Sequence, residues 1–461
     1  MSDWLQLSEI ANLADAQWQG QDTAITGIST DSRRIQPGDL FVALKGERFD
    51  AHDFISPELE QQAQALMVHQ ATVSSLPILQ VDDTLRGLSR WASAWRQQLD
   101  LKMLSITGSN GKTTVKQMCS SILAQMGSVC ATEGNLNNHI GVPLSLLKLR
   151  HEHDYAVIEL GANHQYEIAQ LSELALADVS VITNAGPAHL EGFGSLDGVA
   201  QAKGEIIDGL SLEGSVILNA DDAYFEQWCE RAGKRRVISF GCSEKADYSA
   251  KWQSDNRLQL KTAEYELNIQ IALQGQHNAY NAAAAAAACA ALGATAKAIH
   301  DGLSAMQAIT GRLQMRVGRH GETIFDDSYN ANPASVRAAI EVLAAAAGSN
   351  YLVLGDMGEL GSSGGQLHQA IGKFAKSKHI QKVYALGDLS RQTVVGFGSG
   401  AQHFSSHADL LSALLQDLSA EQDSSVHILV KGSRSMSMEQ IVVGLLATDE
   451  QSLSDTWENR C

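Results

Sequence analysis

Residues 103–118 read MLSITGSNGKTTVKQM, an apolar run followed by a glycine-containing turn and a polar stretch that begins at Lys112. This order predicts a strand that leads directly into the N-terminus of a helix. In such a turn the backbone N–H groups and the helix dipole face an anion, Lys112 offsets negative charge, and the Thr113 hydroxyl can reach Mg²⁺. We therefore predict a phosphate-binding loop. Ile106 stands where the usual G-x-x-x-x-G-K-[ST] pattern has its first glycine, so the loop must be shorter or differently folded. The alternative is an ordinary glycine turn before a helix, without a phosphate.

The segments that follow repeat this pattern of strand and turn. The runs YAVIEL (155–160), VSVITN (179–184) and GSVILN (214–219) each lead into a polar or glycine-rich turn. Short β-rich runs that alternate with helical stretches are typical of α/β domains with largely parallel sheets. Because ligands bind where the strands of such sheets end, the repeated polar turns predict a shared crevice.

The length and the changes of pattern predict three domains. At about 150 residues per domain, 461 residues are too many for one core. Further strand and turn units after residue 320 predict a second sheet, and the start of the chain predicts a small separate α/β domain. We assign the amphipathic helix TLRGLSRWASAWRQQL (84–99) to the middle domain. The predicted domains are 1–82, 83–312 and 313–461.

The composition predicts a soluble protein of the cytoplasm. The first residues lack the apolar core of a signal peptide, and the alanine run 282–291 is far shorter than the ~20 residues that span a bilayer. The net charge of −18 should repel nucleic acid and anionic membranes. The six cysteines show neither metal-binding spacing nor a paired pattern, so we expect no metal cage and no disulfide framework. They are Cys119, Cys130, Cys229, Cys242, Cys289 and Cys461.

Ionisable side chains occupy the predicted strand ends. Glu159 ends the run YAVIEL, where a carboxylate could hold Mg²⁺ directly or through water. Asn184 and His189 lie in the next strand-end turn, where a neutral imidazole could ligate a metal. Lys203 and Glu205 follow in AQAKGEI. Each of these residues, taken alone, is also explained as a solvated surface group.

Amides and an arginine mark the later segments. Asn278 and Asn281 are spaced to share one helix face, where side-chain amides could read a base edge or simply cap the helix. Arg312 in TGRLQ offers a planar, permanently charged fork that suits a transferring phosphoryl group. The stretch FDDSYNANP (325–333) is also explained as a turn alone.

The strings of this chain, taken together and in order, resemble the Mur ligases of peptidoglycan synthesis. The resemblance runs from about Gly27 to Met436 and includes the shorter TG-x-x-GKT loop, in which Gly108 and Gly111 are the glycines that matter. Within the family, YNANP, GDMGELG and KGSRSM are similar to the branch that adds D-alanyl-D-alanine to UDP-N-acetylmuramoyl-tripeptide. Ala51 departs from the glycine expected in DGHDF. The ten ordered strings are TGSNGKTT, GNLNNHIGVPLSLL, ELGANH, TNAGPAHLEGFGS, AKGEI, GQHNAYNAAAA, GRLQ, DDSYNANP, LGDMGELG and KGSRSM.

The resemblance implies a fold and an activity. The first domain would be a small α/β domain for the uridine nucleotide, the central domain a P-loop ATPase-like, mostly parallel sheet, and the last a Rossmann-like α/β domain for the dipeptide. The implied reaction is ATP-driven: the terminal carboxylate of the tripeptide takes the γ-phosphate, and the amine of D-alanyl-D-alanine then displaces phosphate. Mg²⁺, in two copies, would offset the charges that this chemistry brings together. We expect a monomer that closes its domains around these two substrates and ATP and binds neither nucleic acid nor membrane.

The resemblance also implies residue roles. The catalytic residues would be Lys112, Lys203, His189, Glu159 and Arg312. ATP would be bound by Gly108, Ser109, Asn110, Gly111, Lys112, Thr113, Thr114, Asn278, Asn281, Arg312 and Asp327. Metal would be held by Thr113, Glu159, His189 and Lys203, the last as a carbamate formed with CO₂. The UDP-linked substrate would meet Ser29, Asp31, Ser32, Arg33 and Lys45, and the dipeptide Tyr329, Asn330, Asn332, Asp356, Lys431 and Arg434. Asn137 and His139 would also bind substrate.

Two alternatives share parts of this pattern. Another Mur-type ligase, or folylpolyglutamate synthetase, has the phosphate loop and the acyl-phosphate chemistry, but the latter should lack the uridine domain and YNANP. A nucleotide-gated binding protein without turnover is favoured by loss of Lys112, Glu159 or His189, and all three are present.

Overall fold

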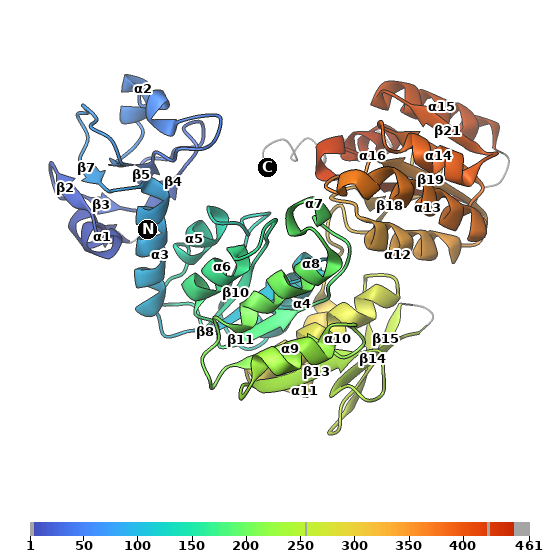
Figure 1. Ribbon diagram of the computed structural model, residues 1–461, viewed down its shortest axis with the longest axis horizontal. Coiled ribbons are helices and arrows are strands. Elements are labelled where there is room, and N and C mark those ends of the chain that lie inside the picture. Colours follow the sequence, from blue (N-terminus) through green and yellow to red (C-terminus); the bar gives the residue numbers. More distant parts are fainter. Residues whose placement is uncertain (1–3, 254–255, 422–424, 447–461) are drawn as a thin grey trace.

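The chain folds into three α/β units that follow one another along the sequence, each with its own sheet. Figure 1 shows the computed structural model, which describes residues 4–253, 256–421 and 425–446. Cys461 lies outside these residues, and the other five cysteines are free thiols. The expected α/β fold with several mostly parallel sheets is confirmed.

The first unit is a small α/β domain. Its elements are β1 (Leu5–Gln6), α1 (Leu7–Ala14), β2 (Gln17–Gln19), β3 (Ala24–Ile25), β4 (Gly27–Ser29), β5 (Asp39–Val42), the 3₁₀ helix η1 (Ala51–Phe54), α2 (Pro57–Glu60), β6 (Ala65–Val68) and β7 (Ile78–Gln80). A five-stranded sheet has the order β2-β7-β6-β5-β4, with β2 antiparallel at the edge, and β1 and β3 form a separate ribbon. Ala51 opens η1 after the Asp50 cap, so the turn accommodates its methyl group.

The second unit contains a nine-stranded sheet. Its strands are β8 (Lys102–Thr107), β9 (Val129–Ala131), β10 (Tyr155–Glu159), β11 (Val179–Ile182), β12 (Ser215–Asn219), β13 (Arg236–Gly241), β14 (Tyr248–Trp252), β15 (Arg257–Lys261) and β16 (Glu266–Gln270). The helices of this unit are α4 (Lys112–Leu123), α5 (Gly141–Leu146), α6 (Glu167–Ala175), α7 (Leu190–Phe193), α8 (Leu196–Gly204), η2 (Glu205–Ile207), α9 (Phe225–Ala232), α10 (Gln276–Ala291) and α11 (Ala296–Ala305).

Helices cover both faces of this sheet, which has the order β16-β15-β14-β13-β12-β11-β8-β10-β9. In β10, Ala156 and Ile158 join the apolar core on the side of α5, α6 and α8, whereas Tyr155 and Val157 join the core on the side of α4, α10 and α11. A continuous apolar run such as YAVI is therefore what a parallel strand buried on both faces requires. Strand β8 lies inside the sheet between β11 and β10, so the turn after it opens at the middle of the carboxyl edge.

Helix α3 (Thr84–Gln97) joins the first unit to the second and packs against both. It contacts α1 on one side and α5 and α6 on the other. Trp91 is fully buried in this shared core, and the ring of Trp4 stacks on it at 5.3 Å between centroids. The apolar stripe predicted for residues 84–99 is thus divided between two units.

The third unit is a six-stranded, Rossmann-like sheet of the order β17-β18-β22-β19-β20-β21, in which only β17 is antiparallel. Helices α12, α13 and α14 cover one face, and α15 and α16 cover the other. The elements are β17 (Gln314–Val317), β18 (Thr323–Asp327), α12 (Pro333–Ala344), β19 (Ser349–Gly355), η3 (Gly361–Ser363), α13 (Gly364–Ser377), β20 (Lys382–Leu386), α14 (Arg391–Phe397), β21 (Ala401–Phe404), α15 (His407–Ala420), β22 (Val426–Lys431), η4 (Arg434–Met436) and α16 (Glu439–Leu445).

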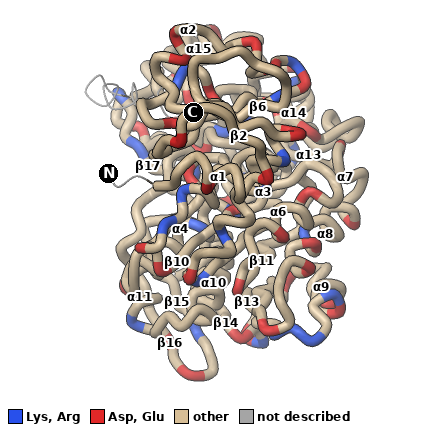
Figure 2. The backbone as a smooth tube through the Cα atoms, turned by 90° about the vertical axis from the view of Figure 1, so that its left-hand side faces the viewer, with Lys and Arg blue, Asp and Glu red and all other residues tan. Residues whose placement is uncertain are grey.

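The charged residues are distributed over all three units. Figure 2 shows acidic and basic residues interspersed along the backbone rather than gathered by sign. Over the described ranges, none of the helices combines the length and the apolar character that crossing a membrane requires.

Candidate functional site

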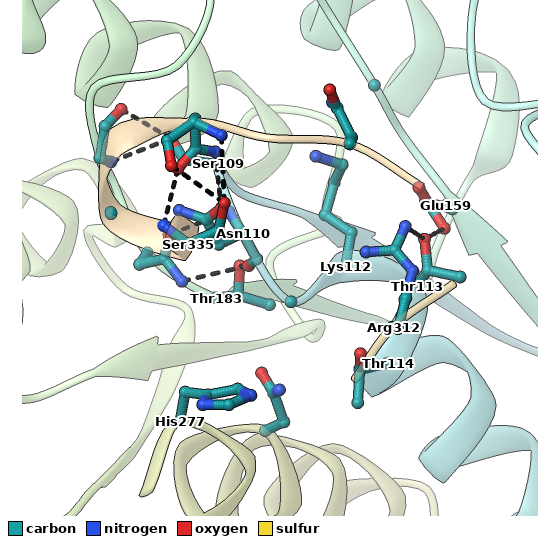
Figure 3. Close-up of a pocket in the computed structure, with 18 of the residues that line it drawn as sticks. Ser109, Asn110, Lys112, Thr113, Thr114, Glu159, Thr183, His277, Arg312 and Ser335 are labelled. Atoms are coloured by element: carbon teal, nitrogen blue, oxygen red, sulfur yellow. Dashed lines mark hydrogen bonds between the residues drawn. The ribbon is translucent and has the colours of Figure 1, made fainter. Parts of the chain in front are cut away.

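A cavity of about 690 Å³ lies where the second and third units meet. Its walls come from the loop between β8 and α4, the ends of β10, β11 and β12, the start of α10, and the segment around β18 and α12. The carboxyl edges of two parallel sheets therefore face one space, as expected for ligand sites of open α/β sheets. Figure 3 shows Thr113, Glu159 and Arg312 together at one side of this cavity and Ser109 and Asn110 at the other.

Two glycines give the loop between β8 and α4 its shape. Gly108 has φ +144° and Gly111 has φ +84°, a region that L-residues with a side chain rarely adopt. A Cβ atom at Gly108 would overlap the Thr183 hydroxyl, and one at Gly111 would overlap the side chain of Asn281. The loop is thus pressed against its neighbours, and Ile106 belongs to the strand before it, as predicted.

The loop after β11 holds the phosphate loop in place. The Ser109 N–H donates to the Asn184 carbonyl at 3.0 Å, and the Ser109 hydroxyl donates to the Gly186 carbonyl at 3.0 Å. The Asn110 N–H donates to Asn184 Oδ1 at 3.1 Å, and the Thr183 hydroxyl donates to the Asn110 carbonyl at 2.6 Å. These bonds between two loops far apart in the sequence stabilise the short form of the loop.

Lys112 and Thr113, the first residues of α4, face the cavity. Lys112 Nζ donates to the Gly108 carbonyl at 2.7 Å, so the ammonium is folded back over the loop. Burial lowers the pKa of Lys112, the nearby Glu159 carboxylate opposes this, and the Arg312 guanidinium lowers the pKa further. Two cations close enough to repel each other form an anion site.

Glu159 is a buried carboxylate at the end of β10 and is surrounded by donors. The Thr113 hydroxyl donates to Oε2 at 2.9 Å, and Asn137 Nδ2 donates to Oε1 at 2.8 Å. Lys116 Nζ, itself buried, lies 3.7 Å from Oε2 and donates to the Thr132 carbonyl at 2.6 Å. Lys116 was not predicted, although its position one helical turn after Lys112 was a signal that the two amines share a face.

Arg312 lies where the second unit joins the third, and it contacts the phosphate loop. Its Nη2 donates to the Thr113 hydroxyl at 2.9 Å, and its guanidinium lies 4.4 Å from the centroid of the Tyr329 ring. Asn332, the N-cap of α12, donates from Nδ2 to Asn110 Oδ1 at 2.7 Å. Sequence spacing could not show these contacts, because about 200 residues separate the partners.

Lys203 lies close enough to Lys112 to be affected by its charge, but it does not line the cavity. It is 1% exposed, and its Nζ lies 5.0 Å from the centroid of the Phe193 ring. Burial, followed by the charge of Lys112, lowers the pKa of Lys203 to about 7, against the opposing effect of Glu205 and Glu167. A substantial share of neutral amine therefore exists near neutral pH.

The start of α10 forms a second, more apolar part of the cavity. Asn278 and Asn281 are buried and share one helix face, with Asn281 Nδ2 donating to Asn278 Oδ1 at 3.0 Å. Phe240 and Leu273 also line the cavity, and nothing in their sequence context distinguished them from core residues. His277 also lines the cavity, and burial lowers the pKa of its imidazole.

Asp327 and Lys431, which were expected to meet different substrates, form a buried ion pair. Lys431 Nζ lies 2.5 Å from Asp327 Oδ2 and donates to the Asn330 carbonyl at 2.8 Å. Asp327 also accepts from the Leu313 N–H at 3.2 Å. The pair therefore fixes the turn DDSYN beside the cavity.

Most of the predicted site residues line this one cavity, and a smaller group does not. Those that line it are Ser109, Asn110, Gly111, Lys112, Thr113, Thr114, Asn137, His139, Glu159, His189, Asn278, Asn281, Arg312, Asp327, Tyr329, Asn330, Asn332 and Lys431. Those outside the lining are Gly108, Lys203, Asp356, Arg434, Ser29, Asp31, Ser32, Arg33 and Lys45.

The outlying residues have local partners. Asp31 forms an ion pair with the exposed Arg33 at 2.8 Å, and this hydrogen-bonded guanidinium is the main reason that the pKa of Asp31 falls to about 2. Asp356 accepts from the Ser390 N–H at 2.7 Å, which anchors the loop after β20. Arg434 pairs with Glu439 at 2.9 Å.

The donor set of the cavity suits a hard divalent cation. Glu159 supplies carboxylate oxygens in a buried setting, Thr113 supplies a hydroxyl 2.9 Å away, and His189 supplies an imidazole at the same cavity. Oxygen ligands beside a phosphate loop are those that Mg²⁺ prefers. The arrangement can therefore bind a nucleoside triphosphate with Mg²⁺ and place its terminal phosphate at the junction of two units.

Comparisons with known proteins agree with this geometry. Three family models match the chain: Mur ligase family, catalytic domain over residues 24–85, Mur ligase middle domain over 106–289, and Mur ligase, glutamate ligase domain over 311–434. The UDP-N-acetylmuramoyl-tripeptide–D-alanyl-D-alanine ligase of Escherichia coli (strain K12) is 43% identical over 444 residues, which are 95% of this chain and 98% of the relative.

Solved structures show the same similarity. A crystal structure of MurF from Acinetobacter baumannii is 36% identical, with a TM-score of 0.89 over 94% of this chain and 97% of the other. MurF ligase from Thermotoga maritima, solved in complex with ADP, is 27% identical, with a TM-score of 0.81 over 94% and 98%. By sequence and by fold, this chain belongs to the Mur ligase family.

Proposed function

We propose that this chain is an ATP-dependent, ADP-forming ligase that joins D-alanyl-D-alanine to UDP-N-acetylmuramoyl-tripeptide. One observation carries the chemistry: Arg312, where the second unit joins the third, bonds to Thr113 of the phosphate loop, beside the buried Glu159. A guanidinium at that point, in addition to the amine of Lys112, favours transfer of the terminal phosphate over simple nucleotide binding. The choice of substrates rests on the relatives, whose names state that pair.

The phosphates of ATP would lie against the loop 108–111 and the first turn of α4. The backbone N–H groups of the loop, Lys112 and Arg312 would bind them, and the α10 amides Asn278 and Asn281 would bind the nucleoside. The Asp327 carboxylate would accept a hydrogen bond from a ribose hydroxyl, because its ion pair with Lys431 leaves oxygen lone pairs available. The Thermotoga maritima relative was solved in complex with ADP, which supports an adenine nucleotide as the ligand.

Mg²⁺, in two copies, would be held by Thr113, Glu159, His189 and a carbamate on Lys203. Bound there, it would neutralise charge between the γ-phosphate and the acceptor carboxylate. The lowered pKa of Lys203 supports the carbamate, because only the neutral amine attacks CO₂. The ammonium of Lys203 would first release one proton, and the neutral nitrogen would then bond to the carbon of CO₂ and lose a second proton, so that a buried cation becomes an anion.

The reaction would proceed in two steps at the junction of the units. The tripeptide carboxylate oxygen attacks the γ-phosphorus and ADP leaves, with Lys112 and Arg312 offsetting the charge that develops. The amine of D-alanyl-D-alanine then attacks the acyl carbon, loses a proton, and phosphate leaves. Exclusion of water is needed throughout, since an acyl phosphate hydrolyses readily.

We assign residues from different segments of the chain to the two peptide substrates. The acceptor would reach it past Asn137 and His139, with its uridine end on Ser29, Asp31, Ser32, Arg33 and Lys45 of the first unit. The dipeptide would lie against Tyr329, Asn330 and Asn332. Two of the three N–H groups of Lys431 are bonded to Asp327 and Asn330, and we assign the third to the dipeptide carboxylate. Asp356 and Arg434 of the same unit would also contact the dipeptide.

We propose that the protein works as a cytoplasmic monomer with three domains, 1–82, 83–312 and 313–461. Each domain would bring one substrate: the UDP-linked tripeptide, ATP and the dipeptide. Neither nucleic acid nor a membrane is part of the proposed reaction.

ADP release tests the proposal. We expect ADP to form from ATP and Mg²⁺ only when UDP-N-acetylmuramoyl-tripeptide is present, and to form repeatedly when D-alanyl-D-alanine is added. Mass spectrometry should show the pentapeptide product. Turnover with folate and glutamate, but none with the cell-wall substrates, would contradict the assignment.

A further inference from the structure

A glutamate of the third unit reaches the proposed metal ligand of the second. Glu359, in the loop 355–361 after β19, has its Oε2 atom against Nδ1 of His189, an atom that is shielded from solvent. The Glu191 N–H also donates to the Glu359 carbonyl, at 3.4 Å. Figure 1 shows α7, which begins just after His189, next to the third unit. Glu359 belongs to the string GDMGELG (355–361), in which the family resemblance implies a role only for Asp356.

The third unit holds this loop firmly. Met357 and Leu360 are buried in the core on either side of the glutamate. The Met357 N–H donates to Nε2 of the buried His368 at 2.9 Å, and the Gly358 N–H donates to the Ser433 hydroxyl at 2.6 Å. Glu359 therefore projects from a loop fixed on both sides and is not a side chain that finds His189 by chance.

Both contacting residues have an unusual backbone conformation. His189 has φ +53° and Glu359 has φ +59°, which is the left-handed region. Non-glycine residues in this region cluster at ligand clamps and switch segments, where the surrounding structure maintains the strain. His189 and Glu359 both have this conformation and touch each other across the boundary between two units. This indicates that their backbone conformations are maintained for the contact.

The chemistry of imidazole assigns a role to the contact between Glu359 and His189. A metal-bound histidine usually donates its other ring N–H to a carboxylate, which fixes both the tautomer and the ring orientation. With Nδ1 directed to Glu359, the nitrogen left for a metal is Nε2.

We propose that Glu359 is a positioning residue that holds His189 with Nε2 directed to Mg²⁺, so that the third unit completes a metal site located on the second. The inference rests on the proposed function for the identity of the cation. Its consequence is that docking of the third unit and metal affinity are coupled. ATP alone, on a separated second unit, would not assemble the complete site.

Binding of Mn²⁺, which substitutes for Mg²⁺ and is visible by electron paramagnetic resonance, tests this with the full chain and a non-hydrolysable ATP analogue. We expect E359A to raise the Mn²⁺ dissociation constant about 10- to 100-fold, the usual effect of removing such a partner. E359Q, whose amide oxygen still accepts from Nδ1–H, should lose less. E191Q is the matched control, because it removes the same charge from an exposed side chain two residues from His189, and it should bind Mn²⁺ like the unaltered chain.

Nuclear magnetic resonance of ¹⁵N-labelled histidine gives a readout that does not depend on turnover. His189 should be the Nδ1–H tautomer in the unaltered chain and a mixture of tautomers in E359A. Unchanged Mn²⁺ affinity in a folded E359A protein would overturn the proposal, and tighter binding would overturn it in favour of a competing role for Glu359. If the unaltered chain fails to ligate the cell-wall substrates but E359A still loses Mn²⁺, the proposed function fails and the positioning role stands.

Discussion

At the scale of single residues, Lys203 shows how burial prepares an amine for chemistry. An exposed lysine has a pKa near 10.5, whereas burial and the charge of Lys112 lower that of Lys203 to about 7. The neutral fraction therefore rises as the pH passes upward through about 7, and protonation below that range blocks attack on CO₂. A lysine with an ordinary pKa would remain protonated over this whole interval.

We expect carbamate formation on Lys203 to increase between about pH 6 and about pH 8. Nuclear magnetic resonance with ¹³C-bicarbonate would measure it directly. The Lys203→Ala variant should lose the signal and most of the ligase activity, and should regain part of the activity when a small carboxylic acid is added. Wild-type rates in this variant would exclude the carbamate.

Lys112 and Lys116 are one helical turn apart in α4, and substitution of each should have a different effect: loss of activity for Lys112 and loss of stability for Lys116. Lys112 faces the cavity, so Lys112→Met should abolish formation of ADP with little loss of stability. Lys116 is buried with Glu159 and the Thr132 carbonyl, so Lys116→Met should lower the free energy of unfolding by on the order of 2 kcal/mol, as expected when a buried charged group loses its partner.

Urea unfolding and ADP release measured on both variants would test this difference. Each variant serves as the control for the other, because both exchange a lysine of the same helix for methionine. If the Lys112 variant kept full turnover, the phosphate loop would have no part in the reaction. If the Lys116 variant were as stable as the original chain, its ion pair with Glu159 would contribute nothing.

At the scale of elements, the loop between β8 and α4 depends on the loop after β11. Gly108 combines a positive φ with close approach to the Thr183 hydroxyl, and the bonds of Ser109 and Asn110 to residues 184–186 depend on that approach. A methyl group there would separate the two loops and misdirect the N–H groups that face the phosphates. The short loop of this chain is thus a property of two adjacent strands and not of one motif.

We expect Gly108→Ala to raise KM for ATP about tenfold or more, since the loss of one good charged hydrogen bond already has an effect of that size. Steady-state kinetics and nucleotide binding by calorimetry would measure it. Gly365→Ala in α13 is a suitable control, because its added methyl would lie 3.6 Å from Gln392 Cγ, an ordinary contact. Equal effects of the two substitutions would contradict the loop argument.

Element type and order could be predicted from the sequence because they depend on local patterns. The run MLSIT became β8, YAVIEL became β10, and the amphipathic stretch 84–99 became α3. The position of Glu159 at a strand end followed from the same pattern. The alternatives for Asn278 and Asn281 remained open because a buried amide that faces a cavity and one that caps a helix have the same spacing.

At the scale of the whole molecule, the cavity lies between the second and third units while the first stands apart from it. Asn332 of the third unit bonds to Asn110 of the phosphate loop, and Arg312, where the second unit joins the third, bonds to Thr113. None of the uridine-site candidates in residues 29–45 lines the cavity among the described residues. A substrate bound to the first unit must therefore reach across, or that unit must move.

We expect the molecule to become more compact when the ATP analogue and UDP-N-acetylmuramoyl-tripeptide bind together, because the acyl phosphate must be shielded from water. Small-angle X-ray scattering would show a smaller radius of gyration with both ligands than with either alone. The dipeptide alone is the control and should leave the radius unchanged. An identical radius in all four conditions would contradict closure.

The sequence by itself determined the three α/β units, the phosphate loop and the polar residues at the strand ends, because these depend on apolar periodicity, glycine placement and helix starts within a few residues. Only the tertiary structure decided which of those residues meet. The pairing of Lys431 with Asp327, the burial that lowers the pKa of Lys203, and the contact of Glu359 with His189 each join segments that are far apart in the chain or depend on the packing around them. Local sequence carries no information on such contacts, since the crossing of elements and the docking of whole units set them.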